Sequence, residues 1–165
     1  MAFFEKHSDL VYIKEEQVVS SWNASIPAAA GNADKFFEEI EQQIKALGIP
    51  DLVVERKQVD SKGASAFIHK VVPRTCLYVH SAAEPVAGFD TFIVFRNYGQ
   101  NLLAARYVVS SVVADTLNLF GKEELTASMS LIHHAVLTAV KKVMGELNQD
   151  FSLISTQSKG ILDIA

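Results

Sequence analysis

The stretch that most constrains this chain runs from residue 89 to residue 147. Residues 89–95 and 102–109 are rich in β-branched and aromatic side chains and predict two strands, and residues 97–101 predict a tight turn between them. A long amphipathic helix follows, because apolar side chains recur at spacings of three and four: Leu125, Met129, Ile132, Val136, Val140, Val143 and Leu147. Together these patterns predict a sheet with a helix packed across one face.

The strand at 89–95 is apolar on both of its faces. Successive side chains of a strand point to opposite faces, and a face in contact with water would carry polar residues. One face carries Phe89, Thr91, Ile93 and Phe95, and the other carries Asp90, Phe92 and Val94. We expect the long helix to cover one face, and another part of the chain, a ligand or another subunit to cover the second.

The middle of the chain predicts a second helix and further strands. Residues 34–47 have an apolar face of helical period, followed by Gly48 as a left-handed cap and Pro50 as a stop. Further strands are predicted at 52–59, 66–72 and 75–80. Short connections favour antiparallel neighbours. The predicted fold is therefore α+β, an antiparallel β-meander of five or six strands with an N-terminal helix and a long C-terminal helix packed on the sheet.

The two ends of the chain are less regular. Residues 1–31 fit either helix or strand, and we favour strand for about 10–22, with a connector at 26–31. The apolar tail at 150–165 predicts an extra strand or a partner-docking segment. Residues 110–121 predict a short helix ended by Gly121. Residues 1–165 are expected to form a single α+β domain, since one core is feasible at this length. The order of elements is loosely similar to helix-grip folds, which enclose apolar ligands.

Composition excludes several classes of partner and compartment. The formal net charge is −4, and no run of Lys or Arg exceeds two residues, which argues against a nucleic-acid surface. No apolar run approaches the ~18 residues of a membrane-spanning helix. The first residues lack a signal-peptide pattern, and the single cysteine, Cys76, fits a reducing compartment. We therefore expect a cytoplasmic protein with no membrane span and no nucleic-acid partner.

The side chains capable of chemistry do not form a recognisable catalytic or metal site. Cys76 and His80 share a strand face but are about 13 Å apart at ~3.3 Å per residue, so the histidine cannot activate the thiol. His133 and His134 are adjacent on a helix and point about 100° apart, so they cannot chelate one metal in the usual way. No phosphate-loop, dinucleotide, hydrolase or zinc motif is present. We predict no catalytic residue, no metal and no cofactor, and rank an enzyme third among the functions.

Arg106 is the one charged residue in the middle of an apolar strand. A buried cation needs an acceptor, because an unpaired buried charge is costly. The preferred interpretation is an edge position or an ion pair with Asp90 or a helix carboxylate. The alternative is that Arg106 contacts an anion in a cleft.

Two functions remain as hypotheses. The first is a non-enzymatic protein-binding module that oligomerises through its sheet or tail, as a homodimer or with a protein partner, because the central strands and the tail are so apolar. The second is a carrier of a hydrophobic small molecule held between the sheet and the C-terminal helix. Its pocket would be lined by Phe92, Phe95, Tyr107, Met129 and Val136. A cavity of ~300 Å³ or more would support the carrier.

Overall fold

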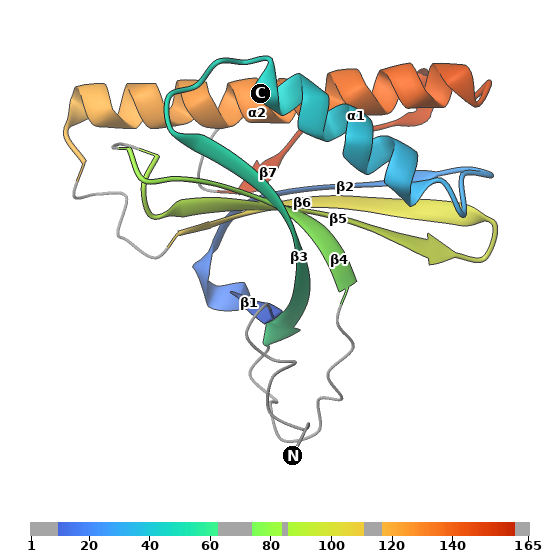
Figure 1. Ribbon diagram of the computed structural model, residues 1–165, viewed down its shortest axis with the longest axis horizontal. Helices are drawn as coiled ribbons and strands as arrows, with labels where there is room; N and C mark the ends of the chain where they lie inside the picture. Colours follow the sequence, from blue (N-terminus) through green and yellow to red (C-terminus); the bar gives the residue numbers. More distant parts are fainter. Residues whose placement is uncertain (1–9, 63–73, 84–85, 111–116, 161–165) are drawn as a thin grey trace.

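The computed structural model describes residues 10–62, 74–83, 86–110 and 117–160, and these form an α+β fold. A curled sheet of seven strands carries both helices on one face (Figure 1). The elements in chain order are β1 (Leu10–Lys14), the 3₁₀ turn η1 (Glu15–Gln17), β2 (Val18–Ile26), α1 (Ala33–Lys45), β3 (Leu52–Lys62), β4 (Arg74–Ser81), β5 (Phe89–Tyr98), β6 (Asn101–Ser110), α2 (Leu119–Glu146), the 3₁₀ turn η3 (Phe151–Leu153) and β7 (Lys159–Gly160).

The predicted antiparallel meander of five or six strands is only partly right. The strand order is β1-β3-β4-β5-β6-β2-β7, with β1 parallel to β3. Strands β3 to β6 do follow one another as antiparallel neighbours. The N-terminal segment, however, supplies β1 at one end of the sheet and β2 beyond β6 at the other. Local turn signals cannot predict such a crossing. The strand predicted at 66–72 lies outside the described residues.

The connection between β1 and β2 explains why the sheet curls. Five strand spacings separate β1 from β2 in the sheet order, about 24 Å in a flat sheet at ~4.8 Å each. Only η1 joins them, and the four residue steps from Lys14 to Val18 span at most about 14 Å. The two sides of the sheet must therefore approach each other. In Figure 1, β1 and the end of β3 bend away from the helices and beneath the sheet.

The central hairpin is tighter than predicted. Strands β5 and β6 continue to Tyr98 and Asn101, which pair directly across a two-residue turn, and Gly99 has a φ of +59°. Arg106 consequently pairs with Ile93, whereas a loop placed at Tyr98–Gly99 had put it opposite Thr91. Because the error is two residues, both residues point to the face that was predicted.

The two predicted helices are present, with revised bounds. Helix α1 buries Phe36, Phe37, Ile40 and Ile44, and Gly48 beyond it has a φ of +64°, as a left-handed cap requires. Gly121 does not end a preceding helix, as had been predicted. It lies in the first turn of α2, where its N–H donates to the Oδ1 of the capping residue Asn118 at 2.8 Å. Lys142 of α2 and Glu39 of α1 form an ion pair of 2.8 Å.

The described part of the tail returns to the sheet. After η3 it reaches β7, a two-residue strand that pairs antiparallel with Ser20 and Ser21 of β2. This is the extra strand that was one of the two predictions for the tail. No helix among the described residues is long and apolar enough to span a membrane.

Candidate functional site on the concave face of the sheet

The sheet has two faces, and the main core lies on the face toward the helices. There Phe36 and Phe37 of α1 pack on Phe95 of β5, with ring centroids 5.2 Å apart in both pairs. The opposite face, which we call the concave face, holds a smaller apolar cluster of Ile13, Val59, Cys76, Phe92, Val94 and Val109. Ile13 belongs to β1, so the curled N-terminal strand of this same chain covers part of the second face.

The concave face also contains a pocket of about 470 Å³. Its floor is formed by small and apolar side chains of the central strands, including Val94 of β5 and Ala105 of β6. Ile13, Glu15 and Val18, from the segment that crosses between β1 and β2, line it as well. The volume lies within the range of small-molecule sites, ~300–1,000 Å³.

Two arginines occupy one end of this pocket. Cys76 of β4 pairs with Val94 of β5. Continuing this antiparallel register by two residues brings Arg74 and Arg96 to neighbouring positions on the same face. Both are exposed and line the pocket, and neither takes part in an ion pair among the residues that the structure describes. Like charges at such positions repel, so the pair is unfavourable unless an anion binds there.

A row of aromatic side chains crosses the concave face beside the pocket. The registers of β4, β5 and β6 align Tyr78, Phe92 and Tyr107, and the rings of Tyr78 and Phe92 stack with centroids 5.0 Å apart. Tyr107 also lines the pocket. The aromatic row thus forms a wall between the two arginines and the polar groups at the other end of the face.

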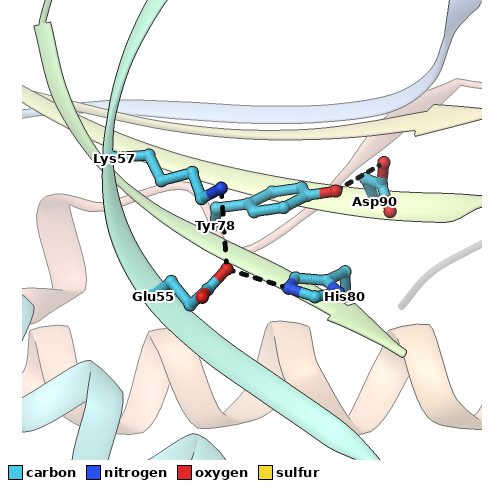
Figure 2. Close-up of polar contacts among 5 residues, drawn as sticks. All are labelled: Glu55, Lys57, Tyr78, His80 and Asp90. Atoms are coloured by element: carbon cyan, nitrogen blue, oxygen red, sulfur yellow. Dashed lines mark hydrogen bonds and ion pairs between the residues drawn. The ribbon is translucent and has the colours of Figure 1, made fainter. Parts of the chain in front are cut away.

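Beyond the wall, five side chains form the polar cluster shown in Figure 2. The Tyr78 hydroxyl donates to Asp90 Oδ2 at 3.0 Å, and the Tyr78 ring stacks on His80 with centroids 4.5 Å apart. Glu55 Oε2 lies 3.0 Å from His80 Nε2 and 3.8 Å from Lys57 Nζ. Strands β3, β4 and β5 contribute all five residues, because their registers place these positions side by side.

Burial keeps the nucleophile candidates on this face protonated. Desolvation raises the pKa of the Cys76 thiol to about 11. Burial, and then the neighbouring Asp90 carboxylate, raise the pKa of Tyr78 well above its usual value. Burial also raises the pKa of Asp90, although the hydrogen bond from Tyr78 opposes this. A protonated thiol and a protonated phenol are weak nucleophiles, so the cluster is suited to hydrogen bonding.

The structure divides the five predicted pocket residues between the two faces. Phe95, Met129 and Val136 are buried in the core on the helix side. Phe92 and Tyr107 belong to the concave face. The alternation of β5 and β6 had not been applied to this set, and one residue of each face was assigned to the same pocket. The five residues therefore do not meet, and the 470 Å³ pocket lies on the face away from α2.

Arg106 is neither at an edge nor paired with Asp90. It points toward the helix side, whereas Asp90 lies on the concave face and accepts the Tyr78 hydroxyl. Arg74 and Arg96 were not predicted as a pair, because their proximity depends on the register of β4 against β5. No group of three or more His, Cys, Asp or Glu side chains in the described part of the chain could hold a metal ion. No family model, curated protein or solved structure matches this chain.

Proposed function

We propose that the protein is a non-enzymatic binding protein that carries a small amphiphilic acid in the concave pocket. The observation that carries this proposal is the pair of arginines at one end of the pocket, on neighbouring strands and without ion-pair partners among the described residues. Guanidinium groups bind carboxylate and phosphate oxygens through paired hydrogen bonds. An acidic head group would remove the repulsion between Arg74 and Arg96.

The rest of the pocket supports an apolar body for this ligand. Ile13, Val18, Val59 and Val94 offer an apolar wall, and Ala105 leaves space where a larger side chain would fill the floor. Asn23 and Ser25 of β2 provide further hydrogen-bonding groups along one side. This arrangement of an apolar wall with a few polar groups is typical of small-molecule sites. The carrier hypothesis is therefore retained, with its pocket moved to the concave face.

Binding of dodecanoate, with dodecanol as the neutral control, tests this proposal by calorimetry. We expect dodecanoate to bind in preference to dodecanol. Arg74→Gln and Arg96→Gln should each weaken dodecanoate binding about tenfold or more, as expected when a charge-assisted hydrogen bond is lost. Arg56→Gln is the matched control, because Arg56 is also exposed but bonds Asp34 of α1 at 3.2 Å.

A second variant blocks the pocket without touching its charges. Ala105→Phe places a ring on the floor of the pocket and should abolish dodecanoate binding while the melting temperature changes little, since Ala105 is only half-buried. Equal binding of acid and alcohol, or full binding by the Ala105→Phe protein, would refute the proposed site.

The protein-binding module is the second candidate, and exposed apolar side chains favour it. Leu119 and Phe120 at the start of α2 are 68% and 71% exposed, and Leu153 of η3 is 70% exposed. Such side chains are common at interfaces when they form a patch. Light scattering over a concentration series tests self-association. Under this second function we expect a mass above that of one chain, reduced by Phe120→Ser, whereas a constant mass of 18.1 kDa would count against it.

A further inference from the structure

The helix side of the sheet buries a cation that has no counter-charge. Arg106 of β6 is 0% exposed and pairs across the sheet with Trp22 of β2. Its Nη2 donates to Ser20 Oγ at 3.2 Å and to Ser158 Oγ at 2.7 Å. Its Nε and Nη1 have no hydrogen-bond partner. Both contacts are thus neutral hydroxyl groups, and two donors of the guanidinium are unused.

The charge of Arg106 persists despite burial. Desolvation lowers the pKa of Arg106 to about 10, which still leaves the group protonated near neutral pH. Burial of an unpaired charge and of unsatisfied donors is unfavourable, and proteins normally compensate for both with a partner. The unused Nε and Nη1 lie on one edge of the guanidinium, the edge that binds two oxygens of one anion side by side.

A second buried group with an unused atom lies close by. His133 of α2 is 0% exposed, its ring centroid is 6.0 Å from that of Trp22, and burial lowers its pKa to about 4, with the charge of Arg106 contributing. Its Nε2 lies 2.8 Å from the carbonyl oxygen of Thr156. Since a carbonyl only accepts, Nε2 carries the hydrogen, and Nδ1 is an unused acceptor.

The segment at 155–158 forms a roof over these groups. Trp22 Nε1 donates to the Ser155 carbonyl at 2.6 Å, and His133 and Arg106 bond Thr156 and Ser158. The roof has no regular secondary structure, and residues 155–157 are exposed. Side-chain hydrogen bonds therefore hold it between η3 and β7. A small solute reaches Arg106 if this segment moves by the width of a few atoms.

We propose that Arg106 binds a small oxyanion that carries a hydroxyl group, the class to which hydrogenphosphate belongs, beneath the 155–158 roof. Two oxygens of the anion accept from Nε and Nη1 of Arg106. Its hydroxyl donates to Nδ1 of His133, so that each unused atom gains a partner. This site is on the opposite face from the concave pocket and does not depend on the function proposed for that pocket.

Thermal unfolding at pH 7 tests the site, with sodium chloride replaced by sodium phosphate at constant ionic strength. Binding to the native state should raise the melting temperature saturably, by about 3–5 °C at ten times the dissociation constant. Arg106→Met should lose this rise, and it should fold, since an apolar residue of similar length replaces a buried charge. Arg96→Met, on the concave face, is the control that should keep the rise.

Sulfate separates the proposed site from general salt effects. It has the shape of phosphate but no hydroxyl at pH 7, and both ions also stabilise proteins by exclusion from the surface. We expect a larger saturable shift with phosphate than with sulfate, and ³¹P line broadening of phosphate by the wild type that Arg106→Met abolishes. If Arg106→Met fails to fold, Ser158→Ala should retain the phosphate shift and His133→Phe should reduce it. Equal shifts with both ions, or no saturable phosphate effect in the wild type, would overturn the proposal.

Discussion

The face of the sheet toward the helices is filled by side chains from α1, α2 and the strands, whereas the concave face is covered by the short segment that crosses from β1 to β2. Both faces of β5 are apolar, so both need a cover. Two helices supply enough side chains to pack one face completely. The crossing segment supplies a few, such as Ile13 and Val18, and leaves a pocket of about 470 Å³. The less completely packed face is therefore where a ligand finds room.

Charged groups are also distributed differently between the faces. On the concave face they line the pocket or form the cluster of Figure 2, where each carboxylate has a donor close by. On the helix side Arg106 and His133 are fully buried and retain unused atoms. Substitutions on the two faces should accordingly differ in cost, and the following predictions test this difference.

The largest contrast is expected for a new charge on each face. Val136→Asp places a carboxylate among the buried side chains between α2 and the sheet, and should cost about 4 kcal/mol or more of a total stability of ~5–15 kcal/mol. Ala105→Asp on the pocket floor should cost less than about 1 kcal/mol, because its carboxylate reaches water. Chemical denaturation followed by circular dichroism measures both. His134→Asp, on the exposed face of α2, is a second mild control, and equal losses for all three variants would contradict the contrast.

The next effect is a loss of stability in weak acid caused by His133. Burial lowers its pKa from 6.5 to about 4, so the unfolded chain binds a proton that the folded chain excludes. The stabilising effect is present above pH 6.5 and is lost as the pH falls toward 4. At about 1.4 kcal/mol per pKa unit the loss is on the order of 3 kcal/mol.

A histidine swap isolates this effect. His133→Gln retains a donor for the Thr156 carbonyl but does not titrate, so its stability should change less between pH 7 and pH 4.5 than that of the wild type. His134→Gln, one residue away and exposed, should behave as the wild type does. If His133→Gln and the wild type lose stability in parallel, His133 is not the buried neutral group described above.

Local patterns were sufficient to predict the helices, the hairpin and the alternation of β5. Helical period located α1 and α2, and the two apolar faces of β5 correctly indicated that both faces are covered. The parallel pairing of β1 with β3 and the place of β2 beyond β6 were not predictable in this way. These contacts join residues far apart in sequence, and their register depends on the curl of the whole sheet.

The same limit explains the outcome at the candidate sites. Arg74 and Arg96 come together through the pairing of Cys76 with Val94, which no spacing in the sequence encodes. The set Phe92, Phe95, Tyr107, Met129 and Val136 was divided between two faces, because apolar character alone does not say which side a strand residue occupies. Only the combination of alternation and register assigns a side chain to a face.

The smallest effect concerns Asp90 in the polar cluster of the concave face. Burial raises its pKa, so the folded chain holds a proton that the unfolded chain has released, and this group's contribution to stability falls as the pH rises through and above the usual carboxyl range. Asp90→Asn keeps an oxygen acceptor for the Tyr78 hydroxyl and removes the charge. It should therefore match or exceed wild-type stability at pH 7, by at most about 1 kcal/mol, since Asp90 is only half-buried. Asp150 is the control of opposite sign, because its hydrogen bonds from Ser152 lower its pKa and Asp150→Asn should lose stability at pH 7. Denaturation midpoints of both variants at pH 4 and pH 7 measure the two signs. A clear loss of stability in Asp90→Asn at pH 7 would mean that the charged carboxylate stabilises the concave face, and the contrast with Asp150 would disappear.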